Sequence, residues 1–125
     1  MSVSIVRVVF LIAAVYDFVI GLVFLFAGPR LFDMAGVPHP NHWAYVHFAA
    51  LLLMIFGTMF AAIARDPIGN RNLIVYGILL KICYAGLVGY TMATTGCPTL
   101  FQPFAAIDAV MCVLFVAAWR RVAMR

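Results

Sequence analysis

Four long apolar stretches, separated by short polar segments, make up most of this chain. They cover about residues 4–27, 43–64, 72–93 and 104–119. A helix needs about 20 mainly apolar residues to cross a bilayer. The fourth stretch is the shortest, and a start nearer Leu100 would lengthen it. Because short connections make sequence neighbours antiparallel, the pattern predicts an all-α integral membrane four-helix bundle running up-down-up-down, with residues 1–125 as one transmembrane domain.

The connection after the first stretch contains its own helical signals. Pro29 suits a helix start and Gly36 a helix stop, so a short interfacial turn is expected over residues 29–35. Leu31, Phe32 and Met34 would then lie on the bilayer surface. A secretory signal is the alternative interpretation of the first stretch, but the apolar run is too long for one and Asp17 interrupts it.

Composition and charge placement support a membrane protein. Hydrophobic residues make up 67% of the chain and charged residues 10%, against about 25% charged in soluble domains. The net charge of +4 does not indicate nucleic acid, because the basic residues flank the apolar stretches. The lipid bilayer is therefore the expected partner. One side of the predicted bundle holds Arg7, Arg65, Arg71, Arg120, Arg121 and Arg125, and the other holds only Arg30. Arginines collect in the cytoplasm, so both termini are predicted to be cytoplasmic.

Three ionisable residues lie far from the ends of the predicted helices. Asp17 follows Arg7, and Lys81 follows Arg71, by ten residues each, or about 15 Å of helix. Asp108 precedes Arg120 by twelve residues, or about 18 Å. Each would cost about 2.5–3.5 kcal/mol if it faced lipid unpaired. The sequence therefore predicts that Lys81 meets one or both carboxylates inside the bundle.

Small residues mark helix faces that can approach one another closely, and in each stretch they share a face with a polar residue. The four predicted faces are Ala13, Asp17 and Gly21; His47, Ala50, Met54, Gly57 and Ala61; Gly77, Lys81, Ala85 and Gly89; and Ala105, Asp108 and Cys112. This spacing predicts His47 above the charged residues, toward the outside. Tyr16 and Tyr84 are expected to donate hydrogen bonds nearby.

Two interpretations of these polar residues stay open. In one, Asp17, Lys81 and Asp108 form a structural ion network that fixes helix register. In the other, they form a functional site for proton transfer, a small polar ligand or a quinone headgroup, because ionisable residues inside membranes are commonly functional. The candidate site residues are Asp17, Lys81, Asp108, His47, Tyr16 and Tyr84.

Metal binding and catalysis have weaker signals. His39, His42 and His47 gather near the start of the second stretch and would suit copper with a nearby thioether or thiol, but their spacing is poor. Cys83 and Cys112 suit small apolar packing positions. The chain has no GxSxG, HExxH, P-loop or GxGxxG motif. No catalytic residue, metal or cofactor is therefore predicted, with quinone and copper as the alternatives.

Several short motifs resemble those of DoxX-like and related small four-span bacterial membrane proteins. They are Tyr16 to Gly21, the loop from Gly28-Pro29 to Val37-Pro38, Phe56-Gly57, the turn Arg65-Asp66-Pro67, and Asp108. The resemblance implies a multi-pass protein of the bacterial inner membrane, with a possible link to quinone-dependent oxidation. The four-span enzymes of glutathione and eicosanoid metabolism are similar in size, but the chain has no glutamate for their Arg-Glu pattern.

The leading functional hypothesis is a subunit or scaffold of a homo-oligomer or larger membrane complex. It would contain a buried network of Asp17, Lys81 and Asp108. The alternative is a proton-coupled carrier or a quinone-site protein that uses the same residues. An enzyme is not favoured.

Overall fold

A computed structural model describes residues 1–123 of the chain. Its four helices are α1 (Val3–Ala35), α2 (Ala44–Arg65), α3 (Arg71–Ala93) and α4 (Gln102–Ala123), and residues 1–123 contain no strand. The predicted all-α class is therefore confirmed. Each helix is also long and apolar enough to cross a membrane. The fourth helix is longer than the predicted stretch because it continues through Arg120 and Arg121. Arg125, counted in the charge argument, lies outside the described residues.

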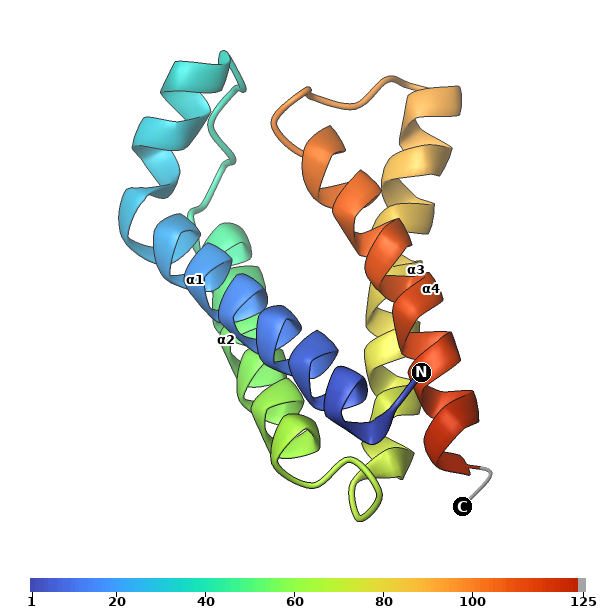
Figure 1. The fold of residues 1–125 in the computed structure, drawn as a ribbon. Helices are drawn as coiled ribbons and strands as arrows, with labels where there is room; N and C mark the ends of the chain where they lie inside the picture. The colour runs from blue at the N-terminus through green and yellow to red at the C-terminus, as the bar shows by residue number, and fades with distance from the viewer. Residues whose placement is uncertain (124–125) are drawn as a thin grey trace.

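The helices form two hairpins, α1 with α2 and α3 with α4 (Figure 1). The hairpins come together where α1 and α3 begin, and they diverge toward the opposite end (Figure 1). We refer to the first end as the arginine end, because Arg7, Arg65, Arg71 and Arg120 lie there. The far end carries the connections 36–43 and 94–101. A hydrogen bond of 2.9 Å from Arg7 Nη1 to the carbonyl oxygen of Arg65 joins the start of α1 to the end of α2.

Helix α1 bends before it reaches the far end. Ala27 leaves the helical region (φ −127°, ψ 17°) two residues before Pro29, whose ring removes a backbone donor and displaces the preceding turn. Helix then continues to Ala35 and stops at Gly36 in the left-handed conformation (φ 69°). The expected turn over residues 29–35 is thus a bent continuation of α1. The predicted surface position of Phe32 is wrong, because this side chain is buried against Trp43, with ring centroids 5.1 Å apart.

Glycines allow α1 and α2 to pack at close range. A Cβ atom on Gly57 would lie 3.0 Å from the carbonyl oxygen of Ala14, and one on Gly21 would collide with the backbone of Ala50. Both contacts involve main-chain atoms, which cannot move aside as a flexible side chain can. Small residues therefore set the distance between these two helices, as expected for packing within a bilayer.

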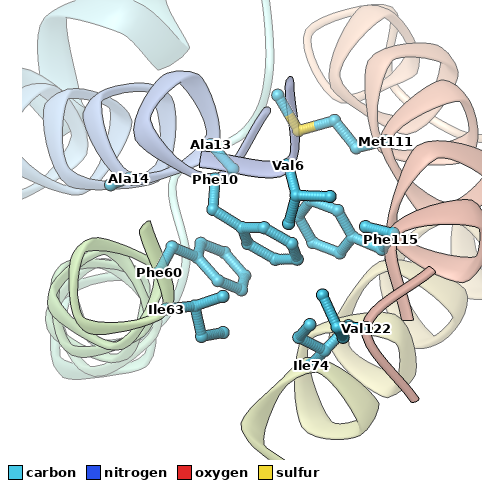
Figure 2. Close-up of a cluster of buried hydrophobic side chains, with 11 residues drawn as sticks. Val6, Phe10, Ala13, Ala14, Phe60, Ile63, Ile74, Met111, Phe115 and Val122 are labelled. Carbon is cyan, nitrogen blue, oxygen red and sulfur yellow. The ribbon is translucent and has the colours of Figure 1, made fainter. Parts of the chain in front are cut away.

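A cluster of apolar side chains from all four helices fills the space between the hairpins at the arginine end (Figure 2). Its centre is aromatic: the ring of Phe10 stacks on Phe115 at 4.5 Å between centroids, and Phe60 meets Phe115 at 5.2 Å. Gly77 provides the room, since a Cβ there would lie 2.7 Å from the Phe60 ring. The two hairpins are thus held together mainly by this cluster.

The predicted helix faces are correct only in part. Asp17 and Gly21 are buried on α1 as expected, and Gly77 and Lys81 on α3. Ala61 and Gly89 are exposed instead. On α2 and α4 the packed positions near the arginine end are large side chains such as Phe60 and Phe115, which fill the space where the two hairpins meet.

Candidate functional site

Lys81 joins three helices near the middle of the molecule. Its Nζ donates to Asp17 Oδ1 on α1 at 2.9 Å and to Asp108 Oδ1 on α4 at 3.1 Å. Lys81 and Asp17 are each 1% exposed, and Asp108 is 7% exposed. The predicted meeting of this lysine with both carboxylates is therefore confirmed.

Aromatic rings surround the remaining side of the ammonium group. Nζ of Lys81 lies 5.5 Å from the ring centroid of Tyr16 and 5.6 Å from that of Phe60. Cations are attracted to ring faces within about 6 Å. The lysine thus has two anionic and two aromatic neighbours, which compensates its removal from water.

Two polar atoms of the same cluster are buried without a hydrogen-bond partner among the described residues. They are Oδ2 of Asp17 and the hydroxyl of Tyr16. Buried polar groups are nearly always satisfied in folded proteins, because leaving one unpaired costs free energy. One acceptor oxygen and one hydroxyl, on adjacent residues, are therefore buried here without a partner.

The other predicted site residues lie outside the ion network. Tyr84 donates its hydroxyl to the carbonyl oxygen of Phe101 at 3.0 Å, not to a carboxylate. His47 is half-buried in the first turns of α2, beside Trp43, with ring centroids 6.4 Å apart. Among the six predicted site residues, only Asp17, Lys81 and Asp108 are joined by hydrogen bonds.

A cavity of about 440 Å³ occupies the far half of the molecule, between the two hairpins. Side chains from all four helices line it, and most of them are apolar or aromatic. Besides the hydroxyl groups of Tyr45 and Tyr84, the polar lining residues are Tyr16, Asp17 and Asp108, which we call the polar floor. This combination of an apolar wall with a few convergent polar groups is typical of small-molecule sites.

The polar floor presents carboxylates to the cavity and hides the lysine. Asp17 and Asp108 line the cavity, whereas Lys81 is not among its lining residues. The ammonium group therefore lies behind the two carboxylates, on the side of the packed aromatic cluster. A molecule in the cavity would meet acceptor oxygens and tyrosine hydroxyls before it met the positive charge.

Aromatic pairs bridge two sides of the cavity. Phe24 of α1 meets Phe104 of α4 at 6.1 Å between centroids, and Phe32 meets Phe101 at 6.0 Å at the far end. Between α2 and α3, in the part of the chain that the structure describes, no aromatic pair of this kind joins the two helices at cavity level. Leu52 and Leu80 line the cavity on that side.

The three histidines lie near the start of α2, and His39 and His47 both pack beside Trp43. His39 Nε2 lies 2.7 Å from Asp33 Oδ1, and the Nδ1 atom of His42 accepts from the backbone N–H of Ala44 at 3.1 Å. Within residues 1–123, no group of three or more histidine, cysteine or acidic side chains is placed to hold a metal ion. The three histidines considered for copper are thus not arranged as a metal site.

The cavity itself is the part of the site that sequence reasoning missed. Its walls are mostly apolar and aromatic side chains. In the sequence, such residues look the same as those that face lipid. The nearest signal in the sequence is the aromatic content of residues 101–104 and the bend introduced by Pro29, but neither indicates a hollow by itself.

Comparison of the chain with family models, with curated proteins and with solved structures finds no match. The resemblance to DoxX-like proteins therefore stays a prediction.

Proposed function

We propose that this chain is a multi-pass membrane protein that binds a small amphipathic molecule taken from the bilayer. The apolar part of the molecule would occupy the cavity, and its polar end would rest on the polar floor. The observation that carries the proposal is the pair of buried unpartnered atoms, Asp17 Oδ2 and Tyr16 Oη, on residues that line a cavity of about 440 Å³.

The rest of the molecule supports a binding role. The packed cluster at the arginine end holds the hairpins at a fixed distance, so the cavity is preformed. A preformed site avoids part of the ordering cost of binding. Asp17 is further held by Lys81, whose hydrogen bond occupies Oδ1 and leaves Oδ2 without a partner.

The expected orientation places the arginine end in the cytoplasm and the cavity in the outer half of a bacterial inner membrane. Arg7, Arg65, Arg71, Arg120 and Arg121 support this orientation, because they belong to one end of the helix pairs while Arg30 belongs to the other. Basic residues near the ends of membrane helices are retained in the cytoplasm. Tags on either terminus of the chain would both be protected from an external protease.

A structural subunit is the second candidate function. It is favoured by the ion network, because Lys81 ties α1 to α3 and α4 between hairpins that otherwise meet mainly at the arginine end. In this case the cavity would be filled by lipid. Such a protein would keep its assembly state when the cavity is filled by mutation, whereas a binding protein would lose its ligand.

Ligand binding is tested with a neutral probe, a decyl-substituted benzoquinone, added to the full chain in lipid nanodiscs. In the Trp119→Phe variant Trp43 is the only tryptophan, and its ring contacts cavity-lining Phe32. We expect saturable quenching of Trp43 fluorescence by the quinone. Linear quenching equal to that of free tryptophan in the same lipid would contradict the proposal.

Matched variants on one helix place the bound probe. Ala49 lines the cavity, so Ala49→Phe would fill it and is expected to abolish saturable quenching. Ala61 is exposed on the same helix outside the cavity, so Ala61→Phe adds the same side chain without that effect. Equal behaviour of the two variants would place the probe elsewhere.

A further inference from the structure

The charges around the polar floor do not cancel. Lys81 supplies one positive charge, and Asp17 and Asp108 supply two negative charges when both are ionised. All three groups are at least nine-tenths buried. A net charge of −1 in an apolar interior is expensive, so the cluster requires one more positive charge, either a proton or a cation.

The ionisable and hydroxyl groups that face this cluster do not supply the missing charge. Helix α1 contributes Tyr16 and Asp17, α2 contributes Tyr45 at the cavity wall, α3 contributes Lys81 and Tyr84, and α4 contributes Asp108. Lys81 is the only cation in this set, and its Nζ is already bonded to both carboxylates. The missing positive charge, whether a proton or a cation, must therefore come from outside the protein.

We propose that the cavity binds a lipophilic monovalent cation, such as a hydrophobic amine or a quaternary onium ion, in exchange for a proton. The inference rests on the proposed binding function and names its substrate class. Its main support is the order of groups at the floor: the carboxylates line the cavity, and the lysine lies behind them. A cation entering from the far half meets negative charge first.

The cavity wall suits an organic cation. Eight of its lining residues are aromatic: Tyr16, Phe24, Phe32, Tyr45, Phe56, Tyr84, Phe101 and Phe104. Ring faces attract cations, most strongly where water is excluded. The wall therefore offers apolar contact and favourable electrostatics to a bulky cation, whereas a lipophilic anion gains only the apolar contact.

The exchange is balanced in charge and atoms. Without ligand, one of the two carboxyl groups carries a proton and the cluster is neutral. When the cation binds, that O–H bond breaks, the proton leaves to water, and the resulting carboxylate pairs with the cation. The cluster is neutral in both states, and one proton is released for each monovalent cation bound.

The test compares two ions of similar shape and opposite charge, tetraphenylphosphonium and tetraphenylborate. The full chain is held in nanodiscs of zwitterionic lipid, and empty discs give the background. We expect tetraphenylphosphonium to produce a given rise in unfolding temperature at a concentration at least tenfold lower than tetraphenylborate needs. In weakly buffered medium it should release up to one proton per protein. Equal effects of the two ions, or binding without proton release, would overturn the inference.

Variants separate failure of this inference from failure of the proposed function. Asp108→Asn removes the excess negative charge, so it should weaken tetraphenylphosphonium binding at least tenfold and abolish the proton release that accompanies it. Asp33→Asn, beside His39 and outside the cavity, should change neither. Quinone binding with no preference for the phosphonium ion overturns only the cation inference, whereas loss of saturable binding by every probe overturns both. If Asp108→Asn does not fold, proton release measured on the unmodified chain tests the cation inference instead.

Discussion

The two halves of this molecule solve the same packing problem differently. At the arginine end, Phe10, Phe60 and Phe115 fill the space between the hairpins. Toward the far end the same two hairpins diverge, and a cavity of about 440 Å³ lies between them. Lys81 and its two carboxylates lie at the boundary. The comparison suggests that the packed half supplies stability, and that the far half is free to bind a ligand.

Removing the positive charge of Lys81 at this boundary should have the largest effect on stability. Lys81→Met leaves Asp17 and Asp108 buried without their cation, and breaking a buried ion pair in this way costs about 3–5 kcal/mol. We expect that loss in the free energy of unfolding, measured by titration with a denaturing detergent.

A triple variant provides the control for this substitution. Lys81→Met combined with Asp17→Asn and Asp108→Asn removes every formal charge from the network, so it should recover part of the lost stability. If the triple variant is less stable than Lys81→Met alone, the carboxylates are not destabilised by losing the lysine, and the boundary is held by other contacts.

Trimming one aromatic ring in each half tests the comparison directly. Phe115 is fully buried between Phe10 and Phe60, so Phe115→Ala should cost about 3–5 kcal/mol. Phe104 belongs to a single aromatic pair at the cavity wall, and Phe104→Ala should cost about 1 kcal/mol, the scale of one such pair. The same detergent titration measures both. Similar losses would mean that the far half is as tightly packed as the other.

A single methyl group added at two glycines gives the smallest expected change. A Cβ on Gly57 would press on the Ala14 carbonyl at 3.0 Å, whereas one on Gly86 meets nothing within 4 Å. Gly57→Ala should therefore destabilise the protein by about 1–3 kcal/mol through overpacking. Gly86→Ala should stabilise it by about 0.5–1 kcal/mol, because alanine loses less entropy in a helix. Thermal unfolding of both variants in one lipid composition would show whether the signs differ.

The sequence predicts the helices and the ion network well, for one physical reason. Hydrocarbon excludes unpaired charges, so Asp17, Lys81 and Asp108 had to meet between helices. Their depth follows from the helical rise alone. Predicting that these three residues meet does not require knowing how far apart the helices lie.

The sequence predicts the shape of the space between the helices poorly. Small residues at a regular spacing indicated a tight bundle along its whole length, but Ala61 and Gly89 are exposed. The angle between the hairpins depends on how bulky side chains such as Phe60 and Phe115 meet across them.

The aromatic bridges Phe24–Phe104 and Phe32–Phe101 have a consequence for how a ligand is delivered. They obstruct the routes between α1 and α4 and through the far end, which leaves the α2–α3 side; in the proposed membrane setting this side would face acyl chains. Occupancy would then follow the concentration of the compound dissolved in lipid, not its concentration in water. Lengthening an alkyl tail that makes no contact with the protein would raise the apparent affinity simply by enriching the compound in the membrane.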